Sequence, residues 1–155
     1  MDLVAEQLTM YGQPASVDGL DWAWVDEQLG DAAAYWTTTA GSGHPHPRPV
    51  WGIWLDHLLY LSVGSPTLAA ELGVGCDVTV NLGSVTDVVV VEGRSVGPAD
   101  EDNLIAAYNY KYDWNYTLEE YGPLTGIAPV KVMAWRSSGW AGRGGFESAG
   151  RWNLM

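Results

Sequence analysis

Basic side chains, cysteine and long apolar runs are all scarce in this sequence. Lys and Arg number 7 against 19 Asp and Glu among 155 residues, which gives a formal charge of −12. Such a charge disfavours binding to nucleic acid phosphates and to anionic membrane surfaces. No apolar run approaches the ~20 residues that cross a bilayer, and the first residues lack the pattern of a signal peptide. We therefore expect a cytoplasmic protein.

Cysteine occurs once, as Cys76, so no disulfide can form within the chain. No Cys and His spacing matches a structural zinc site, and we expect no metal. Cys76 itself is predicted to be a small buried residue at the start of a strand. A chain of 155 residues fits a single domain, and Gly and Pro within residues 1–19 predict an irregular N-terminal arm.

The stretch from Tyr35 to Val63 contains three runs rich in β-branched and aromatic residues, separated by breaks with Gly, Pro and Asp. No helical periodicity competes, so the stretch is predicted to be a β-meander. Further strands are predicted over residues 76–82, 85–96, 127–136 and 146–154. The valines at 88–91 are expected to be buried on both faces, and residues 137–145 are expected to form a flexible loop.

Three short helices are predicted around these strands. The first begins after the capping residue Asp21, and the second begins after Ser65 with Pro66 at its first position. The third opens at Pro98 and Asp100 and is followed by an aromatic segment. Because the early strands join through short turns rather than crossover helices, the fold class is mainly β: a closed antiparallel barrel of six or seven strands with short flanking helices.

The order of these segments resembles the pyridoxamine 5'-phosphate oxidase-like split β-barrels, which bind flavin mononucleotide (FMN) or a deazaflavin coenzyme. The resemblance runs from about residue 22 to residue 152 and implies a homodimer that holds the cofactor in a groove between its subunits. The stretches that carry it are residues 35–39, 46–54 and 59–62, the helix after Ser65, residues 87–93, and Arg151 with Trp152.

The resemblance also implies which residues contact the cofactor. The ring would lie along the second strand and the phosphate near the third strand and the following helix, because a strand backbone can hydrogen-bond a flavin edge and a helix N-terminus attracts phosphate. Barrel packing alone would equally explain any one of these residues. The implied cofactor contacts are Arg48, Pro49, Val50, Trp51, Ser62, Ser65, Thr67, Arg151 and Trp152.

The sequence departs from the family in its cations. Family members carry Lys or Arg on the second strand and at the start of the helix after the third, whereas no Lys or Arg occurs here from Pro49 to Gly93. The field of the carboxylates in that stretch should repel a phosphate, so FMN is expected to bind more weakly than is usual for the family. The residues expected to compensate are Arg48 with the neighbouring hydroxyls, or Arg136, Arg143 or Arg151.

Histidines and aromatic rings supply the candidate substrate contacts. The histidines beside the first hairpin turn suit either proton transfer or a solvated turn, whereas His57 is predicted to be exposed in a tight turn. The aromatic residues of 108–116 are too dense for a core stripe alone, so some rings are predicted to line a cavity or a subunit interface. The candidate substrate contacts are His44, His46, Tyr110, Tyr112 and Trp114.

Two functions fit these observations. The first is a flavin- or deazaflavin-dependent oxidoreductase that acts on a small organic molecule, in which the protein orients and the cofactor supplies the chemistry. The second is a split barrel that has lost its phosphate cradle and binds or transforms an uncharged or cationic small molecule without flavin. Because fold alone does not decide function, both remain open at this point.

Overall fold

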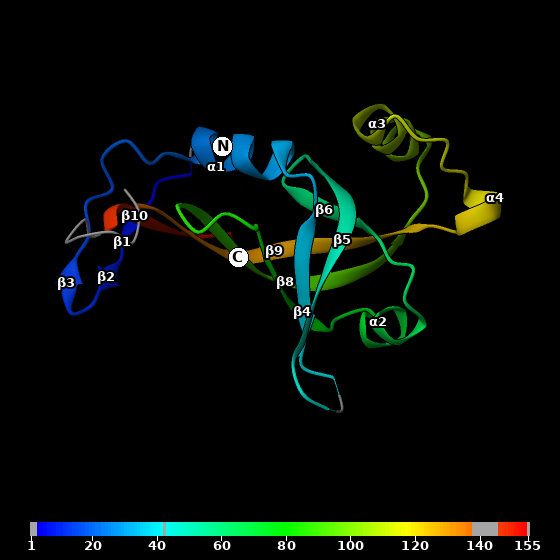
Figure 1. Ribbon diagram of the computed structural model, residues 1–155, viewed down its shortest axis with the longest axis horizontal. Helices are drawn as coiled ribbons and strands as arrows, with labels where there is room; N and C mark the ends of the chain where they lie inside the picture. Colours follow the sequence, from blue (N-terminus) through cyan, green and yellow to red (C-terminus); the bar gives the residue numbers. More distant parts are fainter. Residues whose placement is uncertain (1–2, 42, 138–145, 155) are drawn as a thin grey trace.

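The computed structural model describes residues 3–41, 43–137 and 146–154 and is organised around one antiparallel sheet (Figure 1). The sheet follows the order β1-β10-β9-β6-β5-β4-β7-β8, and β8 pairs with β9 again, which closes a barrel of six strands. The predicted mainly β, antiparallel barrel is thereby confirmed. The strands are β1 (Glu6–Gln7), β4 (Tyr35–Thr39), β5 (His46–Leu55), β6 (Leu58–Ser62), β7 (Asp77–Asn81), β8 (Asp87–Ala99), β9 (Leu124–Ser137) and β10 (Phe146–Asn153).

Within the described ranges, four helices lie around the barrel, namely α1 (Trp22–Asp31), α2 (Pro66–Glu71), α3 (Asp102–Tyr112) and α4 (Leu118–Tyr121). Figure 1 shows α1 on one side of the barrel, α2 on the opposite side, and α3 with α4 at one end. None of the helices in the described ranges is long and apolar enough to span a membrane.

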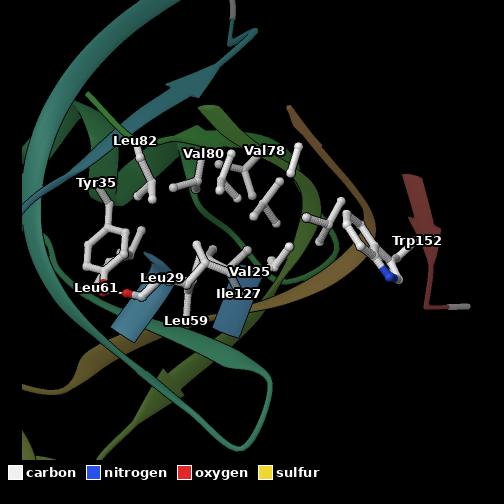
Figure 2. Packing of buried hydrophobic residues seen from close by; sticks show 14 of the residues in the cluster. Val25, Leu29, Tyr35, Leu59, Leu61, Val78, Val80, Leu82, Ile127 and Trp152 are labelled. Carbon is white, nitrogen blue, oxygen red and sulfur yellow. Dashed lines mark hydrogen bonds between the residues drawn. The ribbon is translucent and has the colours of Figure 1, made fainter. Parts of the chain in front are cut away.

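The main core is built by strand alternation and covered by α1. Tyr35, Val80 and Val91 of the strands have no exposed surface. Val25 and Leu29 of α1 are equally buried and belong to the same core. Figure 2 shows Tyr35, Val80, Val25 and Leu29 converging between the strands. The helix spacing of Val25 and Leu29 places both on one face of α1, as the sequence predicts.

The prediction that residues 88–91 are buried on both faces is wrong. Val89 and Val91 are fully buried, whereas Val88 and Val90 are only half-buried. A barrel strand has one face toward the core and one toward the outside, so alternate residues must point outward. The unbroken valine run therefore reflects β propensity rather than two covered faces.

A second, smaller core lies between α3 and the outer face of the sheet. It joins residues of β5, β8 and β9 to the inward face of α3 and to the segment that follows this helix. Tyr116 reaches it because Asn109 holds the Tyr116 backbone: its Oδ1 accepts from Tyr116 N at 2.6 Å, and its Nδ2 donates to Tyr116 O at 3.0 Å. The cluster is Ile53, Ala99, Leu104, Tyr108, Tyr116 and Leu124.

Three element predictions need correction. Pro98 does not open a helix: it belongs to β8, which runs on to Ala99, and α3 begins at Asp102. The described part of the arm is also not irregular, because β1 pairs with β10 and a small hairpin joins β2 (Thr9–Met10) to β3 (Gln13–Pro14). The loop predicted over 137–145 begins one residue later, because Ser137 ends β9; the remainder lies outside the described residues.

Two side-chain predictions also fail. His57 lies in the expected tight turn, with φ values of 50° at Asp56 and 61° at His57, but it is not exposed. Its Nε2 accepts a hydrogen bond from Trp22 Nε1 at 3.2 Å, and its ring stacks on Trp54. Cys76 is half-buried just before β7 rather than enclosed in the core. The burial of His57 arises from its contact with Trp22, which is distant in sequence.

We expect Asp21→Ala to lower the free energy of unfolding by about 1 kcal/mol, the usual cost of losing an N-cap. Asp21 Oδ1 accepts from Trp24 N at 2.9 Å and so satisfies one free amide at the start of α1. Urea unfolding measures the change. Asp18→Ala is the matched control, because Asp18 is exposed and outside the helix; equal losses in the two variants would contradict the capping role.

Candidate functional site: an aromatic face on the second barrel strand

The strand β5 changes its partner halfway along. Residues 46–50 pair with β4, and residues 51–55 pair with β6. In the described parts of the chain, the first half of β5 therefore has no strand on its side away from β4. Pro47 and Pro49 fall in this half. Proline has no N–H to donate, and it is tolerated on the unpaired side of a strand because no ladder hydrogen bond is required there. At these two positions the open edge can offer carbonyl oxygens but no amide donor.

The outer face of β4 and β5 carries aromatic rings. Trp36 lies opposite Pro49 in the ladder, and Trp51 follows on β5 opposite Ser62. Trp36 is 38% exposed and Trp51 is 46% exposed, which is unusual for such large apolar side chains. We call the surface formed by Trp36, Pro49 and Trp51, with Tyr112 and Trp114 beside it, the aromatic face.

The end of α3 holds Trp51 in place. Tyr112 stacks on Trp51 with 4.5 Å between ring centroids and 5° between planes, and Trp114 meets Trp51 edge-on at 6.2 Å. The Tyr112 hydroxyl accepts from Gly52 N at 3.0 Å and lies 2.9 Å from Ala33 O, to which it can donate. Asp113 adopts the left-handed conformation and ends the helix, so that Trp114 can turn back toward β5.

Lys111 is part of the same arrangement, and the sequence analysis did not single it out. Its Nζ donates to Tyr35 Oη and to Gly52 O, each at 2.9 Å, and lies over the rings of Tyr35 and Tyr112. Burial lowers the pKa of Lys111 to about 8, although the charge of Asp31 acts in the opposite direction. The spacing Leu104, Tyr108 and Lys111 places this lysine on the inward face of α3 and could have revealed it.

The predicted phosphate contacts already have partners inside the chain. Arg48 Nη1 lies 3.8 Å from Glu71 Oε2, and Arg48 Nη2 lies 3.1 Å from His46 Nδ1. Thr39 donates to the same carboxylate from β4. The guanidinium is mostly buried, with its side chain 15% exposed, and its Nη1 has no hydrogen-bond partner in the structure described. Arg48 is thus directed at a carboxylate of α2.

The neighbouring hydroxyls are engaged as well. The Tyr108 hydroxyl hydrogen-bonds the Ser62 side chain. Burial raises the pKa of Tyr108, and the bond to Ser62 lowers it by a smaller amount. Ser65 Oγ accepts from Leu68 N at 3.3 Å as the cap of α2, as predicted, whereas Thr67 is exposed. The residues present therefore fit a planar ring at the aromatic face, but the polar cluster does not fit a phosphate while Glu71 remains paired with Arg48.

Arg151 and Trp152 lie elsewhere in the same chain. Arg151 Nη2 contacts Glu6 Oε2 at 2.8 Å, and Trp152 is buried against Trp22 in the main core. Figure 2 shows Trp152 and Tyr35 at opposite ends of that core. Arg136 is also paired, with Asp87 at 3.6 Å, and Arg143 lies outside the described residues.

The candidate substrate contacts fall into two groups. Tyr112 and Trp114 meet at Trp51, and His46 meets Arg48, so the structure brings each of these pairs together. His44 is exposed in the hairpin turn, and Tyr110 is 92% exposed on the other side of α3. No group of three or more His, Cys, Asp or Glu that could hold a metal ion occurs among the residues with a described placement.

No protein-family model matches the sequence, and no curated protein matches it either. Solved structures do match, and three of them illustrate the likeness. The FAD-binding protein of Mycobacterium smegmatis shares 14% identity at a TM-score of 0.51, over 73% of this chain and 93% of that one. A FAD-binding protein of Mesorhizobium loti shares 18% identity at a TM-score of 0.51, over 81% and 90%.

The third structure is the FAD- and heme-binding protein of Mycobacterium smegmatis, with 14% identity and a TM-score of 0.54, over 95% of this chain and 72% of that one. Identities this low show a shared fold. The closed six-stranded barrel and the order of its strands agree with that likeness. The chain therefore shares the fold of these structures, the split β-barrel that its strand order predicts.

Proposed function

We propose that this protein binds a flavin-type cofactor by its ring on the aromatic face and acts as an oxidoreductase on a small organic molecule. The observation that carries the proposal is the fixed, half-exposed Trp51, clamped by Tyr112 and Trp114 beside the open edge of β5. A flat aromatic surface next to free backbone carbonyls suits a planar heterocycle that also has hydrogen-bonding edges. The solved structures of the same fold that bind FAD support this choice.

The proposal includes a homodimer whose groove contains the aromatic face. Trp36 and Trp51 leave a large apolar area uncovered in one chain, and Trp114 and Tyr121 add to it at the end of the barrel. A second copy would remove this area from water and enclose the ring. Light scattering at micromolar concentration tests this part, and a monomeric mass would contradict it.

The arrangement of Arg48 indicates that ring contacts contribute more to cofactor affinity than phosphate contacts do. Because Glu71 neutralises Arg48, FMN should gain little over riboflavin, which has the same ring and no phosphate. Riboflavin, FMN and FAD share one ring and differ only beyond it, whereas a deazaflavin also differs in the ring itself. Titration with each of them therefore shows which portion is recognised. When bound, the cofactor would supply the hydride chemistry, and this chain would orient the ring and exclude water from one side.

We expect Trp51→Ala to weaken binding of riboflavin and FMN alike, by about 2- to 10-fold, which corresponds to ~0.5 to 1.5 kcal/mol of aromatic stacking. Quenching of flavin fluorescence on titration measures both affinities. Tyr11→Ala is the control, because Tyr11 is an exposed ring of the N-terminal hairpin. Unchanged affinity in Trp51→Ala would show that the ring does not bind at the aromatic face.

A second function is favoured by one observation, the Glu71 carboxylate at the place where the family resemblance implies a phosphate. In this alternative the protein binds or transforms an uncharged or cationic small molecule without flavin. The colour of the purified protein separates the two: a flavin band in the absorbance spectrum that persists through gel filtration supports the first. A colourless protein that also fails to bind added riboflavin, FMN or deazaflavin supports the second.

A further inference from the structure

The surroundings of the Lys111 amine consist of hydrogen-bond acceptors. Its Nζ donates to Tyr35 Oη and to Gly52 O. Tyr35 cannot donate in return, because its own proton is used in a 2.6 Å bond to Leu29 O. Across the described part of the chain Lys111 forms no ion pair, whereas Lys131, the other lysine of the sequence, contacts Glu92 at 2.8 Å.

This geometry suits a neutral amine with a free lone pair. A neutral amine has two N–H groups, and the two acceptors can satisfy both. Its lone pair then points away from Tyr35 Oη and Gly52 O, the two atoms to which Lys111 donates. An ammonium would have a third N–H, for which the faces of the Tyr35 and Tyr112 rings, at 4.7 and 5.2 Å from Nζ, are the described partners. A lysine that is desolvated and lacks a carboxylate partner is the usual form of a lysine nucleophile.

A hollow of about 270 Å³ lies beside this lysine, and the Lys111 side chain forms part of its wall. The rest of the wall is mainly apolar and comes from β5, α3 and Gly30 of α1; it includes Ile53, Trp54, Leu55 and Ala107. A hollow of this size is at the lower end of the range for small-molecule sites, and its lining favours an apolar ligand. It therefore suits a compact apolar molecule held beside Lys111.

We propose that Lys111 is a nucleophilic site that condenses with a small apolar aldehyde held in this hollow to form an imine. The Nζ lone pair attacks the carbonyl carbon and a C–N bond forms. The carbonyl oxygen then leaves as water with the two amine hydrogens, so the product is a C=N bond and one water molecule. No oxidant, metal or second reactant is needed. The hollow is lined by residues other than those that form the aromatic face, although Lys111 itself also contacts Gly52 and Tyr112.

The charged and titratable groups around the amine agree with this chemistry. Burial lowers the pKa of Lys111 to about 8. Tyr35 from β4 and Tyr112 from α3 face the amine, and burial raises the pKa of both, so they stay neutral at pH 8. Asp31 from α1 is the charged group that acts on it. About half of Lys111 is thus neutral at pH 8, compared with roughly 1 in 250 for a lysine of ordinary pKa ≈ 10.4.

The test is reductive trapping of the imine in the folded, flavin-free protein. Benzaldehyde and sodium cyanoborohydride are added at pH 8, and peptide mapping by mass spectrometry compares Lys111 with Lys131 and with the N-terminal amine. We expect at least tenfold more label on Lys111 than on Lys131, with a labelling rate that rises through a midpoint near pH 8. Glyoxylate, a small anionic aldehyde, should label Lys111 less than benzaldehyde does, because the hollow is apolar.

The controls keep the result interpretable. Lys131→Arg should retain the label, and Lys111→Arg should lose it while keeping the wild-type circular dichroism spectrum. Equal labelling of the two lysines would overturn the proposal, and so would a Lys111 that reacts only after unfolding in urea. The flavin titrations are read independently, so failure here would leave the proposed cofactor site untouched.

Discussion

Gly52→Ala will lower the free energy of unfolding by about 3 kcal/mol, the upper end of what overpacking usually costs. A Cβ built on Gly52 would lie 2.6 Å from Tyr60 O and 2.9 Å from Leu61 Cδ2. The first of these atoms is backbone of the paired strand β6, so β5 and β6 must move apart to admit the methyl group. Urea unfolding followed by circular dichroism measures the loss.

The same substitution should also disturb the aromatic face. Gly52 N and O bind Tyr112 and Lys111, so a shift of this peptide loosens the clamp on Trp51. Gly64→Ala is the matched control, because a Cβ there meets no atom within 4 Å. It should change stability by less than about 0.5 kcal/mol or stabilise slightly. Equal stability of the Gly52 and Gly64 variants would show that β5 and β6 are less closely packed than the structure indicates.

Glu71→Gln will tighten binding of FMN by roughly 10-fold or more, because it frees a charge-assisted contact worth ~1.5 to 3 kcal/mol. At present Arg48 is neutralised by Glu71, and its Nη1 lacks a hydrogen-bond partner in the described structure. Glutamine retains an oxygen that can accept from Thr39, so the local packing is kept. Arg48→Ala should act in the opposite direction and weaken FMN binding, because it leaves the Glu71 carboxylate unpaired.

Riboflavin is the internal control for this pair of variants. It lacks the phosphate, so neither substitution should change its affinity by more than about 2-fold, within the usual scatter of surface effects. His57→Ala should not alter the ratio of FMN to riboflavin affinity, because His57 packs between Trp22 and Trp54. An unchanged ratio in Glu71→Gln would mean that the phosphate binds away from Arg48. A steep fall of FMN affinity with salt would then point to exposed cations.

The barrel was predictable because its signals are local. The β-branched and aromatic run at residues 35–39, the strand predicted over 76–82 and the cap at Ser65 each depend on a few neighbouring residues, and β4, β7 and α2 are found there. Pro98 was misread because a proline can end a strand as well as begin a helix. The N-terminal strands are only two residues long each, too short to produce a pattern.

The polar part of the candidate site was not predictable, because it depends on contacts between distant segments. Arg48 and Glu71 meet only after β5, β6 and the turn into α2 are placed, so the sequence does not show that the cation has a partner. The Lys111 environment similarly combines α3 with β4 and β5. By contrast, the exposure of Trp51 follows from simple alternation with its neighbours on β5.

The position of β9 has a consequence for the order in which the nascent chain can complete its fold. β9 pairs with β6 on one side and with β8 on the other, so it forms both seams that close the barrel. The strands from β4 to β8 can pair as they emerge from the ribosome, since most of their connections are short. Until residues 124–137 follow, they form an open sheet whose edge strands are β6 and β8. Unpaired strand edges favour association between chains, so a ribosome stalled before residue 124 would expose the form of this protein most prone to aggregate.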